Sequence, residues 1–123
     1  MKKIAEMNAS ELSACLCQIA EPAEKLLSDS AVVEALDGFR KDIPEKSDVA
    51  TAFSLFTTMV VPKLMDKKHQ KDVYSILAAI DGVAVEEIHK RNGLETIRDM
   101  FVVFAMERDV ETIFRPACEA RSK

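Results

Sequence analysis

Side chains that could perform catalysis or bind a metal are few in this sequence and widely separated. His69 and His89 are the two histidines, and neither an HExxH motif nor a Cys/His grouping accompanies them at the spacing a zinc site requires. The serines stand mainly where helices are expected to begin, and no nucleophile is paired with a base. The three glycines lie too far apart to form a phosphate-binding loop. We therefore expect no enzyme activity, metal, cofactor or small-molecule substrate.

The three cysteines are interpreted as reduced thiols that act as small hydrophobic side chains. Cys15 and Cys17 are two residues apart, which separates them by about 200° around a helix. They can therefore neither bridge locally nor share a ligand. Cys118 leaves an odd number of cysteines, and the sequence contains no CxxC spacing.

One basic cluster lies in a short polar stretch and consists of Lys63, Lys67, Lys68, His69 and Lys71. Asp66 and Asp72 interrupt it, and no interleaved aromatic residues support base stacking. The first half of the chain is acidic, because residues 1–62 hold six Lys or Arg against ten Asp or Glu. We therefore expect no nucleic-acid binding. The cluster is either a solvated connection between helices or a docking site for an acidic protein segment.

Composition predicts the fold class. The chain has 123 residues, of which 48% are hydrophobic and 31% charged, values typical of one globular domain. Good helix formers are abundant, while glycine and proline are few. We predict an all-α fold, a compact bundle of about six to seven helices forming a single domain over residues 1–123, with frayed ends at about 1–7 and 117–123. No signal peptide or membrane-spanning run is recognised, so we expect a cytoplasmic protein.

Apolar periodicity and capping residues place the first helices. A helix begins at Asn8 or shortly after it, because Asn8 and Glu11 have the spacing of a capping box. The apolar stripe continues past Pro22, which predicts either a kink or a restart of the helix there. A short helix is expected over residues 31–39. The polar residues 40–47 are then expected to form a loop.

The next helix is predicted to be the central one. It is capped by Ser47 or Asp48, and its inward positions recur at helical spacing: Val49, Ala52, Phe53, Phe56, Met59, Val60 and Leu64. Leu55 and Val61 widen the apolar arc beyond one face. Pro62 is expected to bend the helix before the basic cluster.

Two further helices are predicted between glycine-containing stops. One spans about residues 70–81 and ends at Asp81-Gly82, and its buried positions are expected to be Val73, Ile76, Leu77 and Ile80. A shorter one spans residues 85–91. It contains Glu86 and Glu87 in its first turn, where negative charge interacts favourably with the helix dipole. We expect Asn92-Gly93 to form its left-handed C-terminal cap.

The segment from Leu94 to Phe104 is apolar around nearly its whole circumference. A helix of this kind is buried in a large core or against a partner, and in a chain of 13.7 kDa the partner is a real alternative. A last helix is expected from Asp109 to about Ala120.

The pattern of these helices resembles small tail assembly chaperones encoded by long-tailed phages and prophages of Gram-positive bacteria. The resemblance extends over about residues 49–115. It is carried by His69-x-x-Asp72-Val73-Tyr74-x-Ile76-Leu77-Ala78-x-Ile80, by Val85-Glu86-Glu87-Ile88, by Asn92, and by the helix over residues 97–104.

The resemblance implies an all-helical, non-catalytic protein of the bacterial host cytoplasm that also self-associates. Such proteins bind the long tape measure protein and keep it soluble for tail tube assembly. A chaperone for amphipathic helices needs an apolar groove, and flexible methionines suit a groove that accepts many related segments.

We predict a partner-binding surface on the two most apolar helices, formed by Phe56, Met59, Met100, Phe101, Val102, Val103, Phe104 and Met106. Whether these side chains form a groove or the core stays open, because burying each contributes about 1.5–3 kcal/mol in either case. The alternative function is a small helical adaptor or transcriptional regulator. A helix-turn-helix would require a basic recognition helix, whereas residues 86–91 are short and half acidic.

Overall fold

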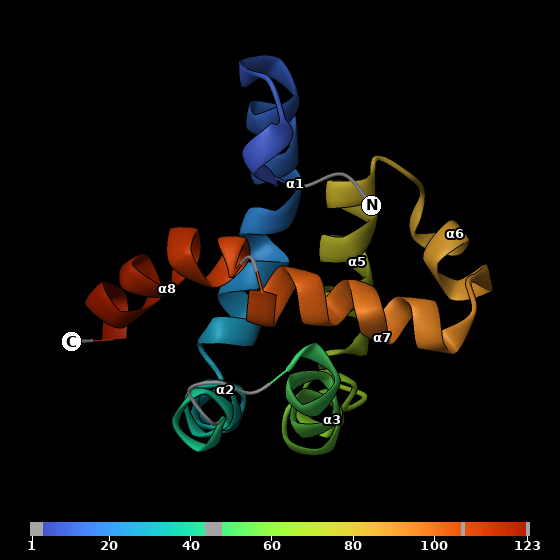
Figure 1. Cartoon of the computed structure of the whole chain (residues 1–123). Helices are drawn as coiled ribbons and strands as arrows, with labels where there is room; N and C mark the ends of the chain where they lie inside the picture. The colour runs from blue at the N-terminus through green and yellow to red at the C-terminus, as the bar shows by residue number, and fades with distance from the viewer. Residues whose placement is uncertain (1–3, 44–47, 107, 123) are drawn as a thin grey trace.

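The apolar periodicity of the sequence is realised as helices in the structure, a computed structural model that describes residues 4–43, 48–106 and 108–122 (Figure 1). The described residues form a single all-helical body without strands, which confirms the all-α fold class. The eight α-helices of the described chain are α1 (Ala9–Leu27), α2 (Ser30–Asp42), α3 (Val49–Met59), α4 (Val61–Leu64), α5 (Gln70–Asp81), α6 (Val85–Lys90), α7 (Gly93–Phe101) and α8 (Asp109–Ser122). A 3-10 turn at Ile4–Glu6 precedes α1, and a π-helix at Val102–Met106 continues α7. Within the described ranges, no helix is long and apolar enough to cross a membrane.

Short polar side chains begin four of the helices. Asn8 Oδ1 accepts a hydrogen bond from the Glu11 amide at 2.9 Å, and the Glu11 carboxylate accepts one from the Asn8 amide at 3.5 Å, which confirms the capping box. Asp29, Asp48 and Asn92 cap α2, α3 and α7 in the same way, each through one carboxylate or amide oxygen. These bonds satisfy backbone donors that the first helical turn leaves free.

Helix α1 runs through Pro22 without restarting, so of the two expectations the restart was wrong. The buried face of α1 includes Ile19 on one side of Pro22 and Ala23 and Leu26 on the other, all 0% exposed. This continuous burial stabilises the helix although proline removes one backbone donor. Helix α8 likewise contains Pro116 in its interior.

Helix α2 is longer than predicted and ends at Asp42. The prediction that a loop begins at Arg40 was therefore wrong. The reason is a contact distant in sequence. The guanidinium of Arg40 pairs with the Glu111 carboxylate and donates to the carbonyl oxygen of Phe104 at 3.3 Å, which holds the last turn of α2 in place. The rest of the expected loop, residues 44–47, lies outside the described residues.

Helix α3 lies at the edge of the molecule, so the prediction of a central helix was wrong (Figure 1). Phe56 is its only fully buried residue among those described, and Val49, expected to face inward, is 65% exposed. The helix packs on α2, α4 and α7, while α1 occupies the middle of the molecule between α5 and α8. Helix α3 ends at Met59, and Pro62 stands in the first turn of α4, where a missing amide donor costs little.

The predicted left-handed cap at Asn92-Gly93 was also wrong. Helix α6 ends at Lys90, its C-cap residue Arg91 has extended backbone angles, and the side chain of Asn92 caps the following helix α7 instead. Only two residues separate α6 from α7, and the Asn92 side chain accepts a hydrogen bond from the first turn of α7. The other expected stop is confirmed, because Gly82 has a φ of 72° and forms a left-handed cap after α5.

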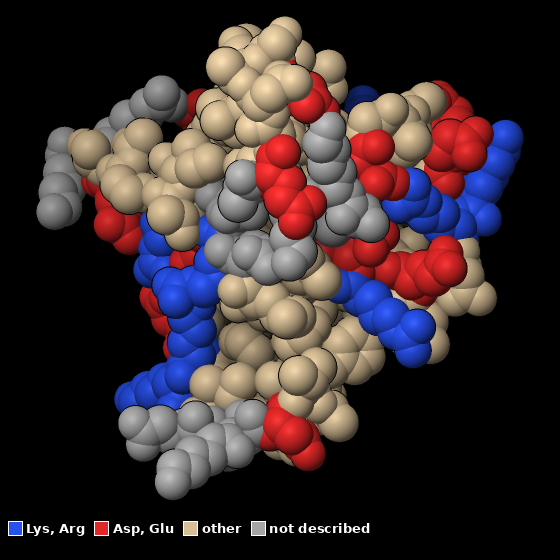
Figure 2. Space-filling view, turned by 45° about the horizontal axis from the view of Figure 1, so that its top comes forward, with Lys and Arg blue, Asp and Glu red and all other residues tan. Residues whose placement is uncertain are grey.

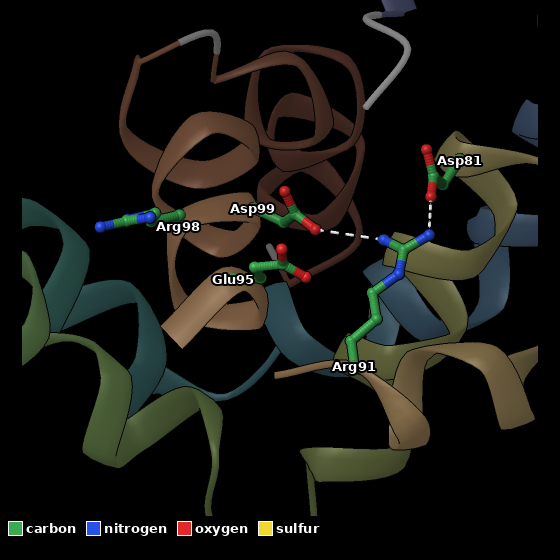
Figure 3. Close-up of a pocket in the computed structure, with 5 residues that line it drawn as sticks. All are labelled: Asp81, Arg91, Glu95, Arg98 and Asp99. Atoms are coloured by element: carbon green, nitrogen blue, oxygen red, sulfur yellow. Dashed lines mark hydrogen bonds and ion pairs between the residues drawn. The ribbon is translucent and has the colours of Figure 1, made fainter. Parts of the chain in front are cut away.

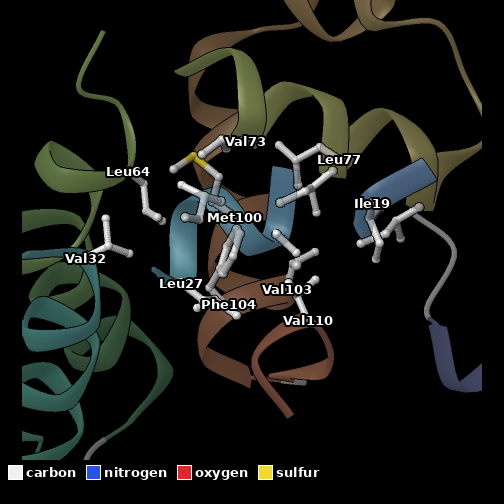
Figure 4. Close-up of a cluster of buried hydrophobic side chains, with 14 of the residues drawn as sticks. Ile19, Leu27, Val32, Leu64, Val73, Leu77, Met100, Val103, Phe104 and Val110 are labelled. Atoms are coloured by element: carbon white, nitrogen blue, oxygen red, sulfur yellow. The ribbon is translucent and has the colours of Figure 1, made fainter. Parts of the chain in front are cut away.

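The core forms where α7 and its π-helical continuation meet α1 and α5 (Figure 4). Aromatic side chains extend it toward the edge of the molecule. Phe101 on α7 meets Phe56 and Phe53 on α3 edge-on, each with ring centroids 5.4 Å apart, and Phe56 also meets Phe39 on α2 at 5.7 Å. Edge-on aromatic pairs stabilise a fold beyond the area they bury. This cluster holds α2, α3 and α7 together.

Replacing Phe56 by alanine should lower the free energy of unfolding by about 3–5 kcal/mol, because Phe56 is 0% exposed and joins two ring pairs. Val49→Ala is the matched control on the same helix and should change it by less than about 0.5 kcal/mol. Urea denaturation followed by circular dichroism measures both. Equal effects of the two substitutions would contradict this placement of α3.

Candidate partner-binding surface

The eight side chains predicted to bind a partner divide into two groups. Five are at most 5% exposed and belong to the core: Phe56, Met100, Phe101, Val103 and Phe104. Met59 and Val102 are half-buried, and Met106 is 55% exposed. A partner can reach the five buried side chains only if the fold rearranges. The surface that is open in this structure therefore has to be located from its shape.

A hollow of about 250 Å³ lies between helices α4, α5, α6 and α7. Its apolar lining is formed by Val61, Met65, Tyr74, Ile88, Ile97 and Met100. Met100 and Ile88 are at most 2% exposed and form its floor, whereas the other four side chains are half-buried. We call this feature the apolar hollow.

Helix α7 connects the apolar hollow to the aromatic cluster at the edge of the molecule. Ile97 and Phe101 are four residues apart and therefore lie on one face of α7. Ile97 lines the apolar hollow, and Phe101 contacts the half-buried Phe53 of α3. Leu94, one turn before Ile97, is 48% exposed. Partly exposed apolar side chains thus lie on both sides of the buried Phe101, with Leu94 and Ile97 on α7 and Phe53 on α3.

Polar side chains form the rim of the apolar hollow. The His89 ring meets Tyr74 edge-on with ring centroids 4.5 Å apart. The guanidinium of Arg91 pairs with Asp81 at the end of α5 and with Asp99 on α7, whose Oδ2 lies 3.2 Å from Arg91 Nη1 (Figure 3). An apolar floor with a few polar groups at its edge is the usual composition of a binding hollow.

A second hollow of about 300 Å³ adjoins the apolar hollow and shares Arg91 with it. Its other lining residues are charged, and Arg98 extends away from Arg91 (Figure 3). Burial raises the pKa of Asp99, and the attraction of Arg91 offsets this only in part. The hydrogen bond to Asp81 raises the pKa of Arg91, so Arg91 stays charged. We interpret these charges as a tie between α5, α7 and the end of α6.

His69, a candidate for chemistry in the sequence, is a buried structural residue. It is 6% exposed, and its Nε2 lies 2.6 Å from Asp29 Oδ2, while the same carboxylate caps α2. Lys68 Nζ lies 3.4 Å from Asp29. The hydrogen bond from His69, followed by that from the Ala31 amide, lowers the pKa of Asp29 to about 2. This contact joins the start of α2 to the start of α5.

Other features bear on chemistry and on surface charge. The described residues include no group of three or more His, Cys, Asp or Glu that could hold a metal ion, and Cys15 and Cys17 are free thiols. On the face shown in Figure 2, basic side chains gather in two groups at opposite sides, with acidic side chains between them. The described residues of this face therefore form no continuous basic surface for a polyanion.

No family model matches the chain, and neither a curated protein nor a solved structure is detectably similar to it.

The sequence prediction missed most of the apolar hollow. Of its lining, only Met100 was among the predicted partner-binding residues. A signal was nevertheless present, because Tyr74, Ile88 and Ile97 belong to the pattern that carries the family resemblance. Val61 and Met65 join them only because α4 packs beside α7, which periodicity does not reveal.

The pKa of Asp29 predicts how stability depends on pH. Its folded value of about 2 lies below the ordinary value of 3.8, so the ionised carboxylate stabilises the folded state above about pH 4. This contribution should be lost as pH falls from about 4 to about 2. Asp29→Asn, which keeps a capping side chain, should therefore be less stable than the natural chain at pH 6 and should approach it at pH 2.

Urea denaturation across this pH range measures the difference for Asp29. Asp48→Asn is the comparison, because Asp48 also caps a helix but no ion pair of Asp48 is found among the described residues. The hydrogen bond from the Thr51 amide also lowers the pKa of Asp48, so Asp48→Asn should show the same direction of pH dependence with a smaller size. A stability difference for Asp29→Asn that stays constant between pH 6 and pH 2 would contradict the role of the charge.

Proposed function

We propose that this chain is a tail assembly chaperone of a long-tailed phage or prophage of Gram-positive bacteria. It acts in the host cytoplasm, binds the tape measure protein and keeps it soluble for tail tube assembly. The binding is non-catalytic and reversible, and the chain also self-associates. The observation that carries the proposal is the half-exposed apolar hollow, in which three residues of the resemblance pattern, Tyr74, Ile88 and Ile97, come together.

The chemistry of the hollow suits an amphipathic helix as its partner. A helix presents apolar side chains at i, i+3, i+4 and i+7, and the partly exposed Leu94 and Ile97 follow one face of α7 toward Phe53. Met65 and Met100 line the hollow and can adjust their rotamers to different side chains. Such adaptability is needed by a chaperone whose long client offers many similar segments.

The size of the hollow is consistent with reversible binding. Its volume of about 250 Å³ is below that of a typical small-molecule site and accepts one or two apolar side chains. Each buried side chain contributes about 1.5–3 kcal/mol before the cost of ordering the client. A single segment is therefore held weakly enough to be displaced by the tail tube subunit.

An affinity pull-down from the source cells after prophage induction, read by mass spectrometry, tests the function directly. The expected result is one very long, helix-rich protein encoded among tail genes, and this protein should be insoluble when expressed without the chain and soluble with it. Recovery of nucleic acid with polymerase-associated proteins would support a transcriptional regulator instead.

Ile97→Asp should abolish capture of the tape measure protein, because it places a charge in the wall of the apolar hollow. Arg98→Asp is the matched control: it changes the neighbouring exposed residue and should leave capture unchanged. Met106→Asp tests the surface predicted from sequence, since Met106 is 55% exposed and does not line the hollow. Thermal melts verify that each variant is folded. Loss of capture with Met106→Asp but not with Ile97→Asp would move the site to the predicted surface.

Complexes with the client and between copies of the chain should persist in about 1 M NaCl, where the Debye length is about 3 Å. Apolar burial is not screened by salt, whereas attraction between the exposed Lys63, Lys67 and Lys71 and an acidic segment would be. Sedimentation and pull-down at low and high salt make the comparison. Release by salt would favour the basic cluster as the docking site.

A further inference from the structure

Helix α6 is held to the molecule by few buried contacts. It has six residues, too few to be stable as an isolated helix. Among the described residues of α6, only Ile88 is fully buried. Val85 is half-buried, and the other four side chains are exposed. Its place in the structure therefore depends on Ile88, on the edge-on contact of the His89 ring with Tyr74, and on the contacts made by the residue that follows it, Arg91.

The segments on both sides of α6 are suited to act as hinges. Gly82, Val83 and Ala84 before it and Asn92 and Gly93 after it are all exposed. Gly82 has a φ of 72°, and at both glycines no atom other than those of the adjoining residues and helix backbone lies within 4 Å of the position a Cβ would take. These two points are therefore not held by side-chain packing. Their backbone is held by helix caps, since the Gly82 amide donates to the Ala78 carbonyl and Asn92 caps α7. Helix α6 lies on the outer side of α5, next to the N-terminal end of α7 (Figure 1).

Arg91 ties this movable helix to the body. Its guanidinium joins Asp81, the last residue of α5, to Asp99 in the middle of α7 (Figure 3). All three side chains are 16–25% exposed, so the tie is accessible to solvent ions. We call the two ion pairs of Arg91 with Asp81 and Asp99 the Arg91 clasp. It lies at the rim of the apolar hollow, which Arg91 also lines.

The closed hollow is shorter than the partner it should receive. Its volume of about 250 Å³ admits one or two side chains, whereas a helix offers apolar anchors over two turns. Ile88 of α6 forms part of the floor, and His89 part of the rim. Outward rotation of α6 would withdraw Ile88, lengthen the hollow along α5, and leave an apolar space that a client side chain can fill.

We infer that α6 is a lid over the apolar hollow, that the Arg91 clasp sets how often it opens, and that an apolar side chain of an amphipathic client helix replaces Ile88 when it does. The opening itself is a property of this chain alone. The identity of the client rests on the proposed function. The apparent affinity for the client is then the affinity of the open state multiplied by the open fraction, so loosening the clasp strengthens binding.

Hydrogen exchange read by mass spectrometry tests the lid without any client. Arg91→Met keeps an unbranched, flexible side chain and removes the guanidinium and its charge. It should accelerate exchange in residues 83–92 about tenfold while residues 70–80 of α5 are unchanged. Asp81→Asn should have the same effect from the other side of the clasp. Arg115→Met is the control, because Arg115 pairs with Asp37 and Glu111 away from α6. In the natural chain, about 1 M NaCl should accelerate residues 83–92, and in Arg91→Met it should not.

Equal acceleration of residues 83–92 and 70–80 in both clasp variants would overturn the lid, because α6 would then open only with the whole fold. No acceleration in either variant would overturn it as well.

Binding is measured with overlapping 30-residue peptides from the long protein captured in the pull-down. Arg91→Met should bind the best peptide several-fold more tightly than the natural chain. Faster exchange with weaker binding would overturn the lid, because α6 would then be a wall that the bound state needs. If no such protein is captured while residues 83–92 still exchange locally, the chaperone function fails and the moving helix stands.

Discussion

One segment, formed by the last turn of α7 and its π-helical continuation, is buried on several sides and decides how the other helices are arranged. Helix α7 and its π-helical continuation contribute Met100, Phe101, Val103 and Phe104 to the core, all at most 5% exposed. Four buried positions within five residues cannot share one stripe of a regular helix, and a π-helical turn alters the angular spacing at this point. Other helices must therefore cover the segment on several faces. Helices α1 and α5 do so on one side, and the aromatic cluster with α2 and α3 on another.

The apolar hollow is a consequence of this arrangement. Near its start, α7 leaves the centre of the molecule. Among the described residues, α4, α5 and α6 line the hollow beside it, and of these α4 and α6 are short. Four and six residues are not enough to cover the face of α7 that continues from Phe101 through Ile97. The stripe that forms the core at one end of α7 is thus half-exposed at the other. Core and proposed binding surface are two ends of the same apolar face.

Charged side chains join the helices at corners where little apolar contact is available. The Glu111 carboxylate is 4% exposed and receives Arg40 from α2 and Arg115 from its own helix. Burial alone would raise the pKa of Glu111, but the hydrogen bonds from the two arginines lower it. Asp29 with His69 joins α2 to α5, and Arg91 joins the end of α6 to α5 and α7. The buried pairs of Glu111 are costly to break and contribute little net stability when intact, so their main effect is to specify which elements meet.

The sequence by itself determined the helical class and several helix ends, among them the starts of α1 and α3 and the end of α5. Apolar spacing, the capping side chains of Asn8 and Asp48, and the left-handed conformation that Gly82 adopts all act within one or two turns, so their effects do not depend on distant residues. Only the tertiary structure decided which apolar faces are covered. Helix α3 is more apolar than its edge position requires, and the end of α2 depends on Glu111, 71 residues away from Arg40. Phe101 and Ile97 lie on the same face of α7, yet Phe101 is buried and Ile97 is half-exposed. The difference arises because the helices α4 and α6 beside Ile97 are too short to cover it, which the residue type does not reveal.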